Sequence, residues 1–525
     1  MSRWGSINPT DGGDTTRVSL SSRWAQETAN YQTKIEAFAV HSTLDLFNDY
    51  TYYLTHPILG DQFRQFDRRS LIGGNAYHTQ KLSLFDKESE LKFGFQSRYD
   101  DIRLGLQDTV NREPYDALRN DHVSEGNISL LTDFKTKWSP WLKTVIGTRW
   151  DYFWGANQGL QSYSNAPIVP TFDAPGANVF NGVAPFRLWT GPFNSGATNA
   201  QLLSPKASVI INPWDQKTDF FFNFGRGFHS NDFRATTQRF STSEVTEEYG
   251  YIPVQRNGLL SASTGGEVGI KTKAIDKLES AATLFFIRTN QENIFEGDTG
   301  NTVIARGANR LGIEFTNHYR PLSWLAFEGD LTATHARFHG YDQEQSDLYW
   351  ALLQPDAFAW GAWAGNAPGN YLINATPVIA TATLELGEAT GWFGNLKYRY
   401  ISPRPLTQDG FFKSPALGTV NLRSGYRWKD GWKLQLDVFN MFNSRSQQVA
   451  YAYGSLLPTD PLYRACNGAS NITTTPEVCG VGQMGVIGHS IEPPSWRLTF
   501  GGPINLDGNL LHNADLSEPF RLVNF

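Results

Sequence analysis

The sequence lacks long apolar runs. None of its 525 residues belongs to a run approaching the roughly 18 residues of a membrane-spanning helix, so a helical membrane protein is excluded. Residues 1–17 contain no basic segment followed by an apolar one, so the pattern of a secretory signal peptide is missing. The net charge of -6 and the absence of lysine and arginine clusters argue against nucleic acid as a partner. Only 2 cysteines are present, which alone say little about compartment.

Aromatic residues and glycines are abundant instead. The chain has 16 tryptophans, 48 glycines and 14% aromatic residues, and its mean hydropathy is -0.39. Length alone would suggest two to four soluble domains. The composition instead fits a long all-β chain in which only alternate strand residues are apolar.

Residues 419–443 show this alternation most clearly. Apolar side chains occupy one parity and polar or charged side chains the other, before and after a glycine turn at 429–431. A period of two around a short turn predicts a β-hairpin. The apolar set is Val420, Leu422, Tyr426, Trp428, Trp432, Leu434, Leu436 and Val438, and the polar set includes Arg423, Lys433, Gln435 and Asp437.

The ends of this hairpin favour a membrane barrel over a soluble sandwich. Trp428 and Trp432 lie at the turn end of the apolar face, where outer-membrane barrels carry an aromatic girdle. An arginine or lysine facing lipid at mid-bilayer would cost about 2–4 kcal/mol. We therefore expect the apolar set to face lipid and the charged set to face the lumen. By the same pattern Ile146 and Trp150 should face lipid, and Arg149 and Asp151 the lumen.

Short and long connections alternate along the chain. Most short links carry a tryptophan beside proline or glycine, and the long links are rich in polar residues and glycine; short turns on one rim and long loops on the other are typical of outer-membrane barrels. The long links are predicted at about 55–67, 100–121, 155–200, 228–262, 290–308, 338–373, 403–416 and 444–491. We count about 17 strands, the last at Ser495 to Gly502. Bacterial single-chain barrels have an even strand number, so five further N-terminal strands would complete a 22-stranded barrel.

The chain resembles the β-barrel of TonB-dependent outer-membrane receptors. The resemblance rests on stretches that span nearly the whole chain in family order: NPTDGGDTTRVSLSSRW from Asn8, LDLFNDYTYYL from Leu44, GDQFRQFDRR from Gly60, NFGRGFHSNDFR from Asn223, GGEVGIK from Gly265, RLGIEFTNHYRP from Arg310, YRYISPRPL from Tyr398, DVFNMFN from Asp437 and EPPSWRLTF from Glu492.

The resemblance implies an all-β, transmembrane antiparallel β-barrel of the 22-stranded type. Family members begin with a signal peptide, a TonB box, a plug and the first strands, none of which is recognised here, so we expect a truncated form. Residues 1–15 are then a loop remnant, 16–502 the barrel and 503–525 a C-terminal tail of unclear role. The implied function is uptake of a scarce ligand such as an iron–siderophore complex. The implied partners are outer-membrane lipid and TonB, acting through the plug; we expect a monomer in the outer membrane of a Gram-negative bacterium, with no cofactor and no metal site.

The two cysteines lie in one long loop. Cys466 and Cys479 are surrounded by Gly, Asn, Thr and Pro, and a disulfide between them would suit an oxidising exterior. Closing such a loop is worth about 3 kcal/mol in the chain-entropy model. Free thiols and a metal role are the alternatives, and two sulfurs alone do not complete a tetrahedral zinc site.

The segment GRGFHSNDFR from Gly225 is the first candidate ligand site. Arg226, His229, Asn231 and Asp232 follow a strand as it leaves the membrane, where they would meet a ligand at the lumen mouth. The alternative, which we favour, is that these residues shape the rim and hydrogen-bond neighbouring strands. Arg226 shares the parity of Phe224, so without a bulge it faces outward.

Aromatic and histidine residues form two weaker candidates. Four loop tryptophans would stack on an apolar or sugar-like ligand, although collapsed loop packing is the simpler explanation. His335 and His339 have a spacing that suits a metal on a helix, but they end a strand, so we interpret them as an interfacial cap. The tryptophans are Trp189, Trp350, Trp360 and Trp363.

Three other function classes remain as alternatives. A passive porin or a barrel-anchored adhesin would share the barrel and lack a plug and TonB box. A barrel enzyme such as a lipase would need a Ser or Asp-His arrangement on the rim, and no such motif, nucleophile elbow or phosphate loop is found, so we expect no enzyme. A soluble β-sandwich array leaves the tryptophan-bearing turns unexplained.

Overall fold

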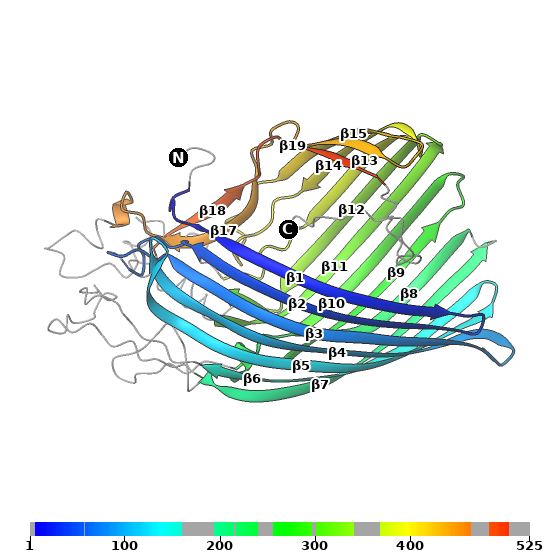
Figure 1. Ribbon diagram of the computed structural model, residues 1–525, viewed down its shortest axis with the longest axis horizontal. Helices are drawn as coiled ribbons and strands as arrows, with labels where there is room; N and C mark the ends of the chain where they lie inside the picture. The colour runs from blue at the N-terminus through cyan, green and yellow to red at the C-terminus, as the bar shows by residue number, and fades with distance from the viewer. Residues whose placement is uncertain are drawn as a thin grey trace.

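A computed structural model describes residues 6–56, 58–159, 194–214, 217–239, 256–296, 301–340, 368–463 and 482–502. Nearly every ordered element is a strand (Figure 1). The elements are β1 (Gly12–Glu27), β2 (Tyr31–Asn48), β3 (Phe63–Leu84), β4 (Lys87–Val110), β5 (Glu113–Ser139), β6 (Leu142–Gly159), β7 (Gly196–Trp214), β8 (Thr218–Ser230), α1 (Phe233–Thr237), β9 (Leu260–Thr272), β10 (Leu278–Glu296), β11 (Asn301–Leu322), β12 (Leu325–Phe338), β13 (Val378–Gly387), β14 (Gly391–Ile401), β15 (Leu417–Arg427), β16 (Lys433–Phe439), β17 (Gln447–Ser455), β18 (Gln483–Ser490) and β19 (Ser495–Gly501).

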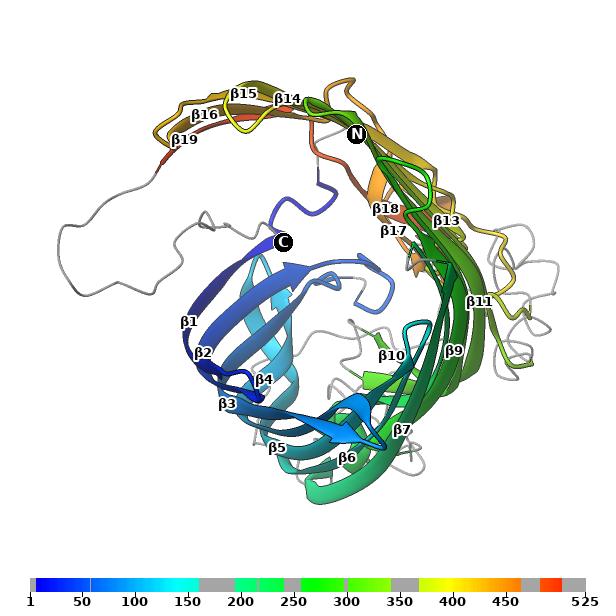
Figure 2. The same cartoon turned by 90° about the vertical axis from the view of Figure 1, so that its right-hand side faces the viewer.

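Seventeen of these strands form one antiparallel sheet. Each strand from β1 to β16 pairs with the next in the chain, and β16 then pairs with β19. The sheet curls around a central space, with β1 and β19 at its two edges (Figure 2). Within the described ranges no register joins β19 to β1. The predicted count of 17 strands is confirmed; β17 and β18 form a separate two-stranded ribbon.

The two faces of the sheet differ as the alternation predicts. In β16, Leu436 is 40% exposed, whereas Asp437 is 3% exposed and pairs with Arg423 of β15. In β6, Ile146 is 64% exposed and Asp151 is fully buried. We call the face that carries exposed apolar side chains the outer face, and the charged face the inner face.

Two predicted long links are wrong. Residues 100–121 and 290–308 were expected to be loops, but β4 and β5 continue to a turn at Asn111 and Arg112, and β10 and β11 run on to Glu296 and from Asn301. In the first case the alternation continues with its polarity reversed. Ile102 and Leu104 are buried on the inner face, while Asp101, on the outer face, bonds His122. The outer face therefore carries charge in this stretch, which a search for an apolar outer face overlooks.

Helices contribute little to the described fold. In the described part of the chain, no helix is both long and apolar enough to span a membrane. The helix α1 has 5 residues and follows β8 at the end of the sheet that carries the long connections, opposite the short β7–β8 turn.

Adjacent positions of β11 test the assignment of faces. Ile313 is an exposed outer residue, and Glu314 is its inner neighbour. We expect Ile313→Arg to reduce the yield of folded barrel, because arginine at mid-bilayer costs about 2–4 kcal/mol. Glu314→Arg, which keeps its charge in the lumen, should fold like the parent chain. Heat-modifiable migration on gels reports the folded fraction, and equal yields from the two variants would refute the assignment.

Candidate functional site

The inner face carries ion pairs both within a strand and between neighbouring strands. Arg149 Nε lies 2.8 Å from Asp151 Oδ1, and the Ser129 hydroxyl donates to the same carboxylate at 2.5 Å. On the opposite part of the sheet, Arg423 Nε donates to Asp437 Oδ1 at 2.6 Å. The predicted inner position of these arginines and aspartates is confirmed. Such a wall presents both signs of charge to the lumen.

The α1 segment, residues 231–238, packs against the inner wall at the long-loop end. Phe233 belongs to a buried cluster with Ile102, Leu104, Val123 and Leu259. A Cβ at Gly155 of β6 would come within 2.6 Å of Phe233, so only glycine admits the ring there. The loop after β8 therefore folds back onto the wall at this level.

A second layer of charge surrounds α1. Asp232 caps the helix by accepting from Arg234 N at 2.8 Å, and it pairs with the Arg234 guanidinium at 2.6 Å. Burial alone would raise the pKa of Asp232, but the charge and hydrogen bonds of Arg234 lower it to about 2. Nearby, Arg119 Nε pairs with Asp121 at 2.9 Å, and both side chains are buried. The α1 segment and the wall beside it thus form a polar patch that is ionised and hydrogen-bonded.

The candidate residues of the GRGFHSNDFR segment divide between the faces. Arg226 pairs with Thr264 in an unshifted β8–β9 register, so it lies on the outer face with Phe224. His229 has the opposite parity. Asn231 is buried, and its side chain donates to Gly258 O, which matches the structural role that we favoured. Together with Asp232, these contacts hold α1 in place, and ligand binding by the four residues stays a prediction.

The histidine pair, the loop tryptophans and the two cysteines are the remaining candidates predicted from the sequence. His335 lies in strand β12, so its spacing to His339 is not helical, as expected. Across the described ranges, no three or more His, Cys, Asp or Glu side chains form a group that could hold a metal ion. The candidates Trp189, Trp350, Trp360, Trp363, Cys466 and Cys479, and the tail 503–525, lie outside the described residues.

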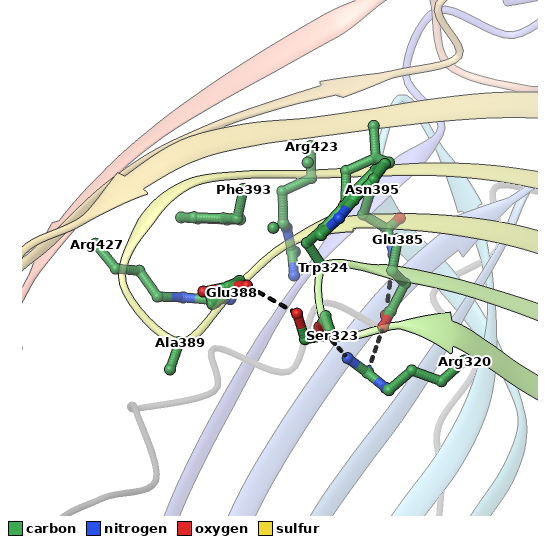
Figure 3. Close-up of a pocket in the computed structure, with 13 residues that line it drawn as sticks. Arg320, Ser323, Trp324, Glu385, Glu388, Ala389, Phe393, Asn395, Arg423 and Arg427 are labelled. Atoms are coloured by element: carbon green, nitrogen blue, oxygen red, sulfur yellow. Dashed lines mark hydrogen bonds and ion pairs between the residues drawn. The ribbon is translucent and has the colours of Figure 1, made fainter. Parts of the chain in front are cut away.

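A polar pocket at the short-turn rim was not predicted. It has a volume of about 350 Å³ and lies beside the β11–β12 and β13–β14 turns (Figure 3). Arg320 pairs with Glu385 at 3.7 Å, and the Ser323 hydroxyl donates to Glu388 Oε1 at 2.8 Å. Arg427 donates to the Glu388 carbonyl at 3.2 Å. The sequence places these charged residues beside the short turns, but only the register brings them together.

A contact that we call the loop clasp joins distant parts of the chain at the long-loop end. Residues 49–62 meet residues 453–463: Tyr52 forms a parallel bridge with Leu456, and Tyr50 stacks near Tyr453 with ring centres 5.7 Å apart. Asp49 is buried here and accepts from Asn8 Nδ2 at 3.0 Å and Tyr52 N at 2.9 Å. Burial raises the pKa of Asp49 to about 7, despite these hydrogen bonds.

Comparisons with known proteins agree with this architecture. A family model described as TonB dependent receptor-like, beta-barrel matches residues 2–441. The ferric yersiniabactin uptake receptor FyuA from Yersinia pestis aligns with a TM-score of 0.58 at 12% identity, covering 87% of this chain and 60% of that one. The siderophore receptor PiuA from Acinetobacter baumannii aligns at 0.62 and 12% identity, covering 93% and 64%. The ferric citrate transporter FecA aligns at 0.59 and 12% identity, covering 95% and 63%.

These structural likenesses establish the fold alone, because the identities are low. The chain spans somewhat less than two thirds of the length of each of these three structures. No curated protein sequence matches the chain.

Two arginines test the role of α1. Arg234→Ala removes the partner of Asp232 and should loosen the α1 segment, since a hydrogen bond to a charged group is worth about 1.5–3 kcal/mol. Limited proteolysis should then cut within 231–259 faster than in the parent chain. Arg226→Ala on the outer face is the matched control and should leave the rate unchanged. Equal cleavage of both variants and the parent would contradict the stabilising role of Arg234.

The clasp should weaken as pH rises. The folded form keeps the Asp49 proton up to about pH 7, whereas the unfolded form releases it near 3.8, so clasp stability falls between these values and is constant above them. Burial would raise the pKa of Asp61, but its hydrogen bonds and the charge of His56 lower it. Protonation of Asp61 therefore changes the stability of the clasp only at pH values below the ordinary pKa of an aspartate.

Hydrogen–deuterium exchange in residues 49–62, corrected for intrinsic rates, should therefore be slower at about pH 5 than at about pH 8. Asp49→Asn should remove most of that difference, because the amide does not titrate. Protection that is the same at both pH values in the parent chain would show that Asp49 is ionised in the clasp.

Proposed function

Because the chain belongs to the family of TonB-dependent receptor β-barrels, we propose that it forms the wall of an outer-membrane importer for ferric chelates of the siderophore class. The proposal includes residence in the outer membrane of a Gram-negative bacterium and coupling to TonB. The two-faced wall carries it: exposed apolar side chains outside and ion pairs such as Arg149–Asp151 inside suit a strand sheet with lipid on one side and a polar path on the other.

The ligand class is supported by the structural relatives. FyuA is a ferric yersiniabactin uptake receptor, PiuA is a siderophore receptor and FecA is a ferric citrate transporter. In this chain, the α1 segment and the polar inner wall below it lie at the long-loop end. We place initial ligand contact there, with His229 and Asp232 as the first residues to test, together with the predicted loop tryptophans.

Coupling would act at the opposite rim. In the family a plug inside the barrel transmits the pull of TonB, and the polar pocket around Arg320 and Glu388 lies at the short-turn rim, which in such barrels faces the periplasm. Its mixed charges suit a polar protein surface rather than an apolar small molecule. We therefore propose this rim as the contact surface for the energised machinery.

Uptake in the source cells tests the function. Deleting the gene should abolish high-affinity uptake of at least one radiolabelled ferric siderophore, and restoring the native gene should return it. Removing TonB from the same strain should have the same effect as deleting the gene, because the proposed transport is energised.

The rival functions give different results in this experiment. Uptake that persists without TonB and extends to unrelated small solutes would identify a passive porin. Surface attachment without any uptake would identify an adhesin. Either result would overturn the importer.

A further inference from the structure

The outer face contains a groove of about 580 Å³ across strands β2 to β6. Registers place five residues in one row along it, namely Ile35, Ala76, Phe95, Leu130 and Trp150. Ala76 is the smallest of the five and lies between the exposed side chains of Ile35 and Phe95. The groove therefore arises because the small side chain of Ala76 lies between larger side chains on the outer face.

One end of the groove is polar. The Thr33 hydroxyl lies 2.9 Å from His78 Nδ1, and the Tyr31 ring centre is 5.6 Å from that of His78. Thr33 and His78 form the next cross-strand pair after Ile35 and Ala76. Since Thr33 engages Nδ1, the other ring nitrogen of His78 is the one available to an outside group. A hydroxyl, an imidazole and a phenol thus gather at one end of the groove, and the lining also includes the hydroxyls of Thr132 on β5 and Thr148 on β6.

The polar end is the end nearer the short-turn rim. Thr33 is the third residue of β2, directly after the β1–β2 turn, whereas Trp150 is the ninth residue of β6. Four strand spacings of about 4.8 Å separate β2 from β6, giving a groove of about 19 Å. With strands tilted by about 35–45°, the groove rises by about 11–13 Å, which is less than half of a hydrocarbon core about 30 Å thick.

We propose that this groove binds one acyl chain of a phospholipid from the periplasmic leaflet, with the phosphate headgroup at Thr33 and His78. The inference rests on the proposed outer-membrane location. The occupant follows from the surroundings: the outer face would meet lipid, most of the groove wall is apolar, and the groups of Thr33, His78 and Tyr31 gather at the end nearer the headgroups. The lipid is a ligand of defined position, distinct from the annular lipid that covers the rest of the wall.

The test measures retained phosphatidylethanolamine by native mass spectrometry of the full chain, folded in detergent and titrated with this lipid. The parent chain should retain one molecule. Ala76→Phe fills the groove at Ala76 and should weaken lipid retention about ten-fold, which is the effect of displacing roughly two methylene groups of the acyl chain. Thr132→Phe fills the groove from β5 and gives the same readout if the first variant folds poorly.

The matched control is Ala207→Phe. Ala207 lies on the outer face between Ile146 and Phe224, away from the groove, so its replacement should leave retention unchanged. Equal loss from Ala76→Phe and Ala207→Phe, or no retained lipid in the parent chain, would overturn the proposal.

The headgroup contact has its own experiment. His78→Ala should weaken retention of phosphatidylethanolamine but not of diacylglycerol, which has the same acyl chains and no phosphate. Equal weakening for both lipids would refute the headgroup position. These measurements need only the folded barrel, confirmed by heat-modifiable migration, so they stand or fall independently of whether the protein imports ferric chelates.

Discussion

Backbone hydrogen bonding in an apolar environment is the constraint on which this structure depends. A strand in hydrocarbon has no water to satisfy its N–H and C=O groups, so every strand must pair with a neighbour along its length. The registers meet this demand without interruption over long stretches, as in the 22 consecutive pairs between β3 and β4. Pairing in turn fixes which parity faces lipid, and the inner parity is left for charge. The ion pairs of the lumen wall are therefore a consequence of strand pairing.

The two edge strands of the sheet show what happens where this pairing stops. β1 and β19 have a paired neighbour on one side only within the described structure, and in a bilayer the free groups of each need partners. At the long-loop end, the clasp brings the β2–β3 loop onto the segment after β17, so a loop from the N-terminal part of the sheet contacts the segment that leads into β19. The clasp is held by tyrosines and a buried Asp49, so its stability depends on pH.

A structural feature could be predicted from the sequence when the residues of one strand or one hairpin were enough to define it. The hairpin of β15 and β16 could be predicted because Leu436 and Asp437 differ in polarity and the turn has a glycine. The extension of β4 and β5 beyond lipid was missed because Ile102 and Asp101 exchange the usual facing there. The α1 segment and the rim pocket were missed because Phe233, Arg320 and Glu388 acquire their roles from partners distant in sequence. The outer position of Arg226 was predicted correctly, because its parity within β8 was enough to define it.

The central claim is that one parity of each strand faces lipid and the other faces water. Spin labels placed one at a time at residues 310–315 of β11, in a chain whose Cys466 and Cys479 are replaced by serine, would test it in a reconstituted bilayer. The account predicts a period of two: labels at 311, 313 and 315 collide preferentially with oxygen dissolved in lipid, and labels at 310, 312 and 314 with a water-soluble nickel complex. Collision rates without this alternation would contradict the assigned wall and the functions proposed from it.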